Sequence, residues 1–141
     1  MKYYNVDILT PSKIIAKGVL AESLLIPTVR GQINVLENHT HIVTKLSVGL
    51  LTVFGGPDYA DRHFVVSDGV CKILEDKVVI LSNSVEENTN VDVEGAKIDL
   101  VNAEAHLKNT ENLSTEEIAG YQHKVELAKI RIQVGEFLRP R

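Results

Sequence analysis

The residues of this chain whose types could do chemistry are a few histidines, several carboxylates and one cysteine. His39 and His41 are two positions apart, so on a strand they would share one face and could supply two metal ligands. A protein metal site needs three or four ligands, and the spacing identifies no third. The pattern therefore does not favour a metal site, although a small metal-dependent β-barrel enzyme remains a distant alternative.

Two other constellations have the right residue types for catalysis. Cys71 could act as a nucleophile beside His63, but it alternates with Ile73 in an apolar segment, which predicts a buried and inert thiol. Asp58 and Asp61 flank a predicted hairpin tip with nothing apolar around them to raise a carboxyl pKa. The chain also has no phosphate-binding glycine loop and no dinucleotide fingerprint. We therefore expect no catalytic residue and no cofactor.

Composition excludes further classes of protein. The 141 residues carry 15 Lys and Arg against 19 Asp and Glu, a net charge of −4, which argues against nucleic acid as a ligand. A single cysteine allows no intrachain disulfide and indicates a reducing compartment. No apolar run approaches the roughly 20 residues that cross a bilayer. Any membrane association is therefore expected to be indirect, through another protein.

The elements that position these residues change in type near Asn88. Before it, short runs of β-branched and aliphatic residues are separated by turn residues, which is typical of a β-sandwich or barrel. The expected strands are Tyr4 to Ile8, Lys13 to Gly18, Leu20 to Ile26, Gln32 to Leu36, Ile42 to Leu46, Leu50 to Phe54, His63 to Val66, Val70 to Leu74 and Val78 to Ser82. The pattern predicts a β-sandwich of about nine or ten short strands over residues 1–87.

Residues 88–141 have a helical period instead. Apolar residues recur at spacings of three and four in two segments separated by a polar break, and Ser114 with Glu117 forms a capping box at the start of the second. One face is Val93, Ala96, Leu100, Ala103 and Leu107; the other is Ile118, Tyr121, Val125, Ala128, Ile132 and Gly135. We expect an antiparallel two-helix hairpin with a shallow, alanine-bearing seam, which makes the whole chain an α+β protein.

The second helix is more apolar than one partner requires. A further row, Leu127, Ile130, Val134 and Phe137, predicts a second surface: the row packs on the β part, or it also contacts another protein. Gly120 and Gly135 each cost about 1 kcal/mol relative to Ala inside a helix. Such positions suit a helix that rearranges and equally suit close packing.

One segment resembles a known family. Residues 31–43, GQINVLENHTHIV, are similar to the signature loop and strand of the ATP synthase epsilon subunit, the counterpart of the mitochondrial delta subunit. Asp7, Gly18, Gly49 and Ser67-Asp68-Gly69 also match the family, and the resemblance covers the whole chain in order. It implies a β-sandwich domain, residues 1–87, that binds the stalk and rotor ring, and a regulatory helical hairpin, residues 88–141.

The chain also departs from the family pattern. Where the family usually has glycines and prolines in this loop, the chain has Asn34, Glu37, Asn38 and His41, which removes fixed backbone angles. By resemblance, Arg30, Gly31 and Gln32 are candidates for contact with the rotor ring, and His39 for contact with the stalk.

Some bacterial members bind ATP where the hairpin begins, through a motif that includes Asp, Arg and Ala. Here the segment reads Val91-Asp92-Val93-Glu94-Gly95-Ala96, so Gly95 replaces the arginine that could complement a phosphate. We expect weak ATP binding or none, with Asp92 instead starting a helix.

The resemblance implies a function. It is that of a non-catalytic rotor subunit of a proton-translocating ATP synthase, which couples proton flow to ATP synthesis and inhibits ATP hydrolysis through its C-terminal helices. The implied partners are the gamma subunit of the central stalk, the ring of c subunits and, through the hairpin, the alpha and beta subunits of the catalytic head. The implied location is peripheral, on the cytoplasmic side of the cell membrane. The alternative is a free-standing β-sandwich adaptor whose hairpin binds some other protein.

Overall fold

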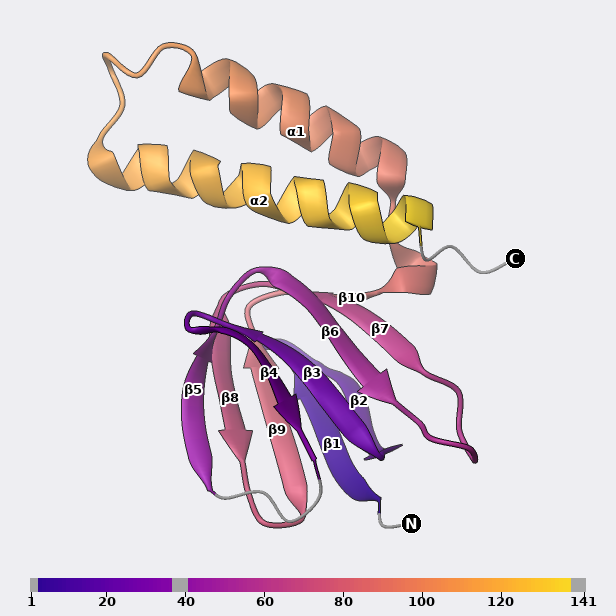
Figure 1. Ribbon diagram of the computed structural model, residues 1–141. Helices are drawn as coiled ribbons and strands as arrows, with labels where there is room; N and C mark the ends of the chain where they lie inside the picture. The colour runs from indigo at the N-terminus through magenta and orange to yellow at the C-terminus, as the bar shows by residue number, and fades with distance from the viewer. Residues whose placement is uncertain (1–2, 37–40, 138–141) are drawn as a thin grey trace. The chain divides into compact units, whose positions relative to one another are not determined.

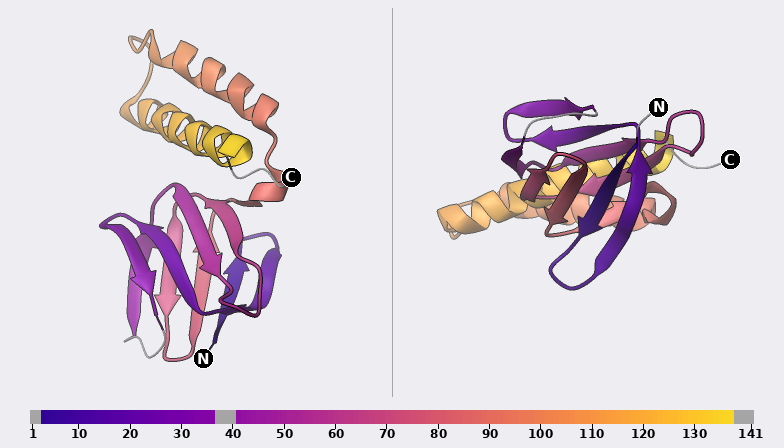
Figure 2. Two further views of the ribbon diagram at one scale, coloured as in Figure 1. Left: turned by 45° about the vertical axis from the view of Figure 1, so that its right-hand side comes forward. Right: turned by 90° about the horizontal axis from the view of Figure 1, so that it is seen from below.

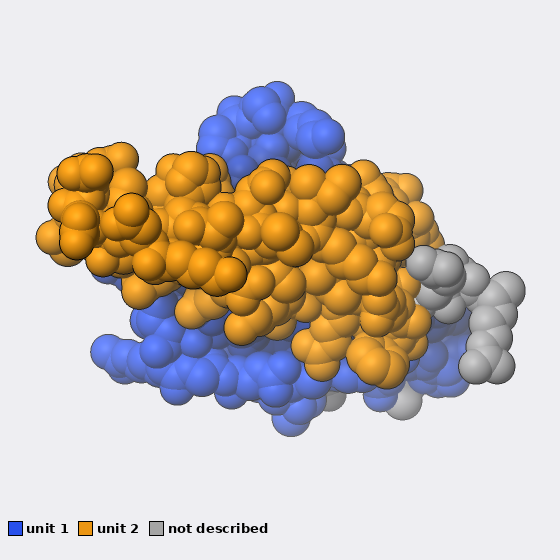
Figure 3. Space-filling view, turned by 90° about the horizontal axis from the view of Figure 1, so that it is seen from above, with its two compact units in different colours: residues 1–87 blue, residues 88–141 orange. Residues whose placement is uncertain are grey.

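The computed structural model describes residues 3–36 and 41–137, and it divides the chain into two compact units, Met1–Glu87 and Asn88–Arg141. Figure 3 colours the two units separately. Each unit has its own secondary structure type, β in the first and helical in the second.

The described part of the first unit contains ten strands (Figure 1). They are β1 (Tyr4–Leu9), β2 (Ile14–Ala21), β3 (Ser23–Thr28), β4 (Gly31–Val35), β5 (Ile42–Leu46), β6 (Gly49–Phe54), β7 (Arg62–Val66), β8 (Gly69–Ile73), β9 (Lys77–Ser82) and β10 (Val85–Glu87). Their order is β10-β7-β6-β3-β5-β8-β9-β1-β2, with β4 also paired to β3. The predicted β-sandwich of nine or ten strands is confirmed.

The strands form one sheet that folds over on itself. The pairs are antiparallel except for β1 with β9, and β3 and β5 are joined through a single residue pair, Thr28 with Leu46. That narrow junction separates a β10-β7-β6-β3-β4 half from a β5-β8-β9-β1-β2 half. Inward-facing side chains of both halves, such as Ile8, Leu24 and Phe64, are fully buried and form the core.

One strand boundary was predicted wrongly, and one strand was not predicted. The expected break at Gly18 is absent, because β2 continues to Ala21 and the chain turns at Glu22. Gly18 has φ +66° and donates its N–H to the Asp7 carboxylate across an irregular register, so the strand bulges there without ending. Strand β10 went unpredicted because its three residues, Val-Glu-Glu, carry almost no pattern.

The second unit is the predicted helical hairpin. After a single turn of 3-10 helix (Asn88–Asn90), α1 spans Val93–Leu107 and α2 spans Thr115–Phe137. The two helices lie side by side in the left view of Figure 2. The capping box is present, since Glu117 N donates to Ser114 Oγ and Ser114 N to Glu117 Oε1, each at 3.1 Å. The predicted end of α2 at Leu138 lies outside the described residues.

Candidate functional site

The predicted ring-contact residues lie on the exposed turn between β3 and β4. Arg30, Gly31 and Gln32 are all exposed, and Gly31 has φ +108°, a conformation that side-chain-bearing residues rarely adopt. Thr28 braces the turn, because its hydroxyl donates to the Gly31 carbonyl at 2.5 Å and accepts from Arg30 N at 3.2 Å. The turn therefore presents the Arg30 guanidinium and the Gln32 amide from a fixed backbone. The predicted stalk contact, His39, lies outside the described residues.

The turn is joined to a second exposed surface through β5, because Val29 N donates to the carbonyl of Lys45 at 3.1 Å. From Lys45 a cross-strand row runs through β8, β9, β1 and β2. In register order its members are Lys45, Val70, Leu81, Leu9 and Ile14. The inward neighbours Cys71 and Ile80 are fully buried, so this row faces outward by the alternation of strand side chains.

We name the four apolar members, Val70, Leu81, Leu9 and Ile14, the outer row. Leu81 is 41% exposed and Ile14 60% exposed, so a contiguous apolar strip lies on the surface. Exposed strips of this kind mark binding surfaces more often than single exposed residues do. The parallel row beside it contains Val43, which is 69% exposed, and Lys72.

Two lysines stand near the outer row, although the chain as a whole is acidic. Lys45 and Lys72 stand on the same face, and the carboxylate of Asp7 is already bound to Lys77 Nζ at 2.9 Å. The hydrogen bond from Gly18 N, helped by Lys77, lowers the pKa of Asp7 below its usual range. The face is therefore suited to a partner surface that is apolar at its centre and acidic at its rim.

Asp92 starts α1, as predicted. Its carboxylate accepts from Gly95 N at 3.0 Å in an N-cap geometry with extended backbone. A Cβ placed on Gly95 would lie 2.5 Å from Asp92 Oδ2, so a side chain at this position would require the Asp92 carboxylate to shift. Asp92 thus has a structural role here, and Gly95 offers no cation.

The seam between α1 and α2 is thin, as its alanines predicted. The buried residues of the two helices are Val93, Ala96 and Ala103 on α1 and Ala128, Val134 and Gly135 on α2. Midway along the hairpin a groove of about 350 Å³ opens between the helices. Apolar side chains do not fill this part of the seam, so polar contacts carry more of the pairing.

Ion pairs and a ring stack cross between the helices in the part of the chain that the structure describes. Lys97 Nζ lies 3.2 Å from Glu136 Oε1, and Arg131 Nη1 lies 3.4 Å from Asp99 Oδ2. Towards the hairpin loop, His106 stacks on Tyr121 with ring centroids 4.4 Å apart. Exposed ion pairs contribute only about 0.2–1 kcal/mol each, so the hairpin is held by many weak contacts.

Gly135 and Gly120 have different roles in α2. A Cβ on Gly135 would lie 2.3 Å from Val93 Cγ2, so this glycine lets the end of α2 approach the start of α1. A Cβ on Gly120 would meet nothing within 4 Å. The glycines were expected to serve either a rearrangement of the helix or close packing, and close packing is the role of Gly135.

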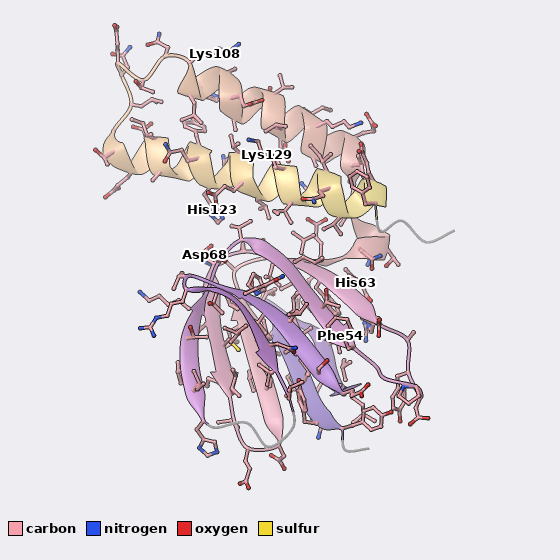
Figure 4. All side chains as sticks on the ribbon, viewed as in Figure 1. Phe54, His63, Asp68, Lys108, His123 and Lys129 are labelled. Atoms are coloured by element: carbon pink, nitrogen blue, oxygen red, sulfur yellow. The ribbon has the colours of Figure 1, made fainter. Side chains whose placement is uncertain are left out.

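The residues considered for catalysis are held in structural roles. Cys71 is fully buried, as predicted, and burial raises its thiol pKa to about 12. His63 on β7 (Figure 4) contacts the hydroxyl of Thr52 at 3.2 Å. Asp58 accepts from the hydroxyl of Tyr3 at 2.7 Å, and Asp61 from Gly55 N at 3.0 Å, so both carboxylates brace the β6–β7 loop.

No group of three or more metal-binding side chains occurs within residues 3–36 and 41–137. His41, the described member of the histidine pair, lies exposed just before β5. Across the same ranges, no helix is long and apolar enough to cross a membrane.

The outer row was missed from sequence, although one signal for it was present. Val78 to Leu81 is a continuous apolar run, where a strand with one wet face should alternate. That run indicates apolar residues on both faces of β9. Which residues of other strands join Leu81 depends on register, which the sequence does not reveal.

Comparison with known proteins agrees with this architecture. Residues 3–88 match the family model described as ATP synthase, Delta/Epsilon chain, beta-sandwich domain. The ATP synthase epsilon chain of Persephonella marina is 34% identical over 132 residues, covering 94% of this chain and 96% of the relative. The chloroplastic epsilon chain of Chlamydomonas reinhardtii is 30% identical over 139 residues, covering 96% of each.

Solved structures share the fold. A chain of the Euglena gracilis mitochondrial ATP synthase aligns with TM-score 0.76 at 19% identity, covering 90% of this chain and 78% of that one. A chain of the Tetrahymena thermophila mitochondrial ATP synthase central stalk and c-ring aligns with TM-score 0.62 at 10% identity, covering 93% and 95%.

Proposed function

Since this chain belongs to the delta/epsilon family of ATP synthase subunits, we propose that it is the epsilon subunit of a proton-translocating ATP synthase. In this role it is a non-catalytic part of the rotor. It couples the central stalk to the ring that proton flow turns, and it restrains ATP hydrolysis through its helical unit.

In this proposal the β-sandwich unit is the attachment module, and the outer row is the observation that carries the assignment. Leu81 and its neighbours offer an apolar strip beside Lys45 and Lys72, which suits a stable contact with the gamma subunit of the stalk. The braced turn at Arg30, adjacent to Lys45 through β5, is the proposed contact with the c-subunit ring. Both contacts together would make the unit a bridge between stalk and ring.

A charged substitution in the outer row tests the attachment. Leu81→Asp places a carboxylate in the proposed apolar contact, and we expect at least a tenfold loss of affinity for stalk and ring particles that lack epsilon. Ile98→Asp is the matched control, because Ile98 is 61% exposed on α1, outside the proposed contact. Equal binding by both variants, with both folded, would remove the outer row from the interface.

The helical unit is the proposed regulatory arm, acting on the alpha and beta subunits of the catalytic head. Its shallow seam allows two arrangements to differ by only a few kcal/mol, within the range that partner contacts can reverse. Lys124 and Lys129 are exposed on α2 and available to an acidic partner, and Figure 4 labels Lys129. Glu116, Glu117, Glu126 and Glu136 on the same helix reduce its net positive charge.

ATP is not the proposed ligand of the arm. The Asp92 carboxylate is engaged as the cap of α1, and Gly95 supplies no guanidinium. Isothermal titration with ATP should therefore give no saturation at micromolar concentrations. Micromolar binding would assign Asp92 a second role and reverse this part of the proposal.

The proposed location follows from the partners. A subunit held by the stalk and ring lies at the membrane surface, on the cytoplasmic side, without entering the bilayer. Copurification of the chain with stalk and catalytic-head subunits, from membranes washed at low salt, tests this location. Recovery without those subunits would instead favour a free-standing adaptor.

A further inference from the structure

Strand β10 is the last element of the β-sandwich unit and lies at the end of the strand order. Its three residues, Val85–Glu87, pair with Val66, Val65 and Phe64 of β7, and each is only partly buried. A short edge strand with little buried surface opens easily. Any contact beyond the backbone ladder therefore has a large effect on how firmly β10 is attached.

Such a contact is present at the final residue of the strand. Arg62 Nε donates to Glu87 Oε2 at 2.9 Å and Arg62 Nη2 to Glu87 Oε1 at 2.8 Å, so the pair is bidentate. The guanidinium also lies 5.2 Å from the centroid of the Phe64 ring, which is fully buried. The Arg62 side chain is 37% exposed and that of Glu87 is 23% exposed, so water screens the ion pair only in part. This hydrogen-bonded pairing lowers the pKa of Glu87 and raises that of Arg62.

A second anchor lies three residues earlier. Ser84 N donates to Ser67 Oγ at 2.9 Å, and Ser82 Oγ donates to the Ser84 carbonyl at 2.8 Å. Ser67 and Ser82 are buried, so this cluster is sheltered from water. The chain is thus held twice before it leaves the β unit, firmly at Ser84 and then by the ion pair at Glu87.

We propose that the Arg62–Glu87 pair is a catch that sets where the helical unit is free to pivot. With the catch closed, β10 stays on β7 and the tether between the units begins after Glu87, which is the unit boundary. With the catch open, β10 leaves the sheet and the tether begins after Ser84. Three extended residues add about 10 Å to the reach of the arm. The regulatory meaning of this added reach rests on the proposed function; the catch itself does not.

The catch is tested on the isolated full-length chain with Arg62→Gln. This variant keeps Glu86 and Glu87 as sites for a protease that cleaves after glutamate. We expect cleavage there, and hydrogen exchange of residues 85–90, to become about tenfold faster, with exchange at Ser67 and Ser82 unchanged. Lys13→Gln is the matched control, since it removes an exposed basic residue from the connection between β1 and β2, and its exchange at residues 85–90 should equal that of wild type.

Two further variants keep the test decisive. Glu87→Gln removes the other partner of the ion pair and should accelerate exchange at residues 85–90 to a similar extent. It provides the test if Arg62→Gln folds poorly. The swapped pair Arg62→Glu with Glu87→Arg should restore slow exchange. Unchanged exchange in both single variants would overturn the proposal, as would acceleration that spreads to Ser67 and Ser82. None of these readouts involves ATP synthase, so failure of the catch and failure of the proposed function are separate results.

Discussion

The two units of this chain differ in how closely their side chains pack. The β unit encloses a core in which Leu24, Leu51, Phe64 and Ile80 have no exposed surface. In the helical unit, small buried residues such as alanines and a glycine, together with exposed ion pairs, hold the helices together, and a groove between them is partly open. A rigid body that presents a surface and an arm that changes arrangement need these opposite properties. The contrast is therefore the physical basis of the proposed division of labour.

The largest expected effect comes from the same substitution made in each unit. Leu51→Ala removes a fully buried side chain of β6 and should lower the free energy of unfolding by about 2–5 kcal/mol. Leu100→Ala in α1 truncates a half-buried side chain beside a thin seam and should cost about 1 kcal/mol or less. Urea unfolding followed by circular dichroism measures both. Equal losses would show that the seam is as well packed as the core.

The next effect is a pH dependence of the stability of the β unit, and it comes from Asp7. The lowered pKa of Asp7 means that its contribution is present above its unfolded pKa, about 4, and is lost as pH falls through the lower folded value. Asp7→Asn should therefore destabilise the β unit by about 2 kcal/mol at pH 6. At pH 2 it should cost much less, because the wild-type carboxyl is then protonated as well. Urea midpoints at the two pH values test this, and a difference that grows in acid would contradict the assignment.

Alanine substitutions at the two glycines of α2 are expected to change the stability of the helical unit in opposite directions. Gly120→Ala should stabilise the helical unit by about 1 kcal/mol, because nothing opposes the added methyl group. Gly135→Ala forces that methyl group against Val93 and should destabilise the unit by about 1–2 kcal/mol. Hydrogen exchange of α1 and α2 reports both changes. Stabilisation by Gly135→Ala would mean that the helices do not meet closely there.

The smallest effect is that of salt on the seam. Raising sodium chloride to about 0.5 M should weaken the Lys97–Glu136 and Asp99–Arg131 pairs by a few tenths of a kcal/mol each. Exchange in α1 and α2 should accelerate slightly, while the core strands of the β unit stay unchanged. Lys97→Gln should reduce this salt response. An unaltered response in that variant would remove the pair from the seam.

Features set by neighbouring residues could be read from sequence. The Ser114–Glu117 capping box and the Asp92 cap each connect residues three apart, and the helix faces follow a local period. The outer row and the Arg62–Glu87 pair were missed because they depend on strand register and join residues up to 72 positions apart, as for Leu9 and Leu81. Arg30, Gly31 and Gln32 were proposed from a family resemblance, and the structure adds the braced turn that presents them.

The most direct measurement of the central claim removes the arm and follows attachment and inhibition together. Residues 1–87 and the full chain are each added to ATP synthase depleted of epsilon, after circular dichroism establishes that the shortened chain is folded. We expect the shortened chain to bind the stalk with an affinity within about threefold of that of the full chain and no longer to inhibit ATP hydrolysis. Loss of binding by the folded β unit, or inhibition that persists without the arm, would contradict this claim.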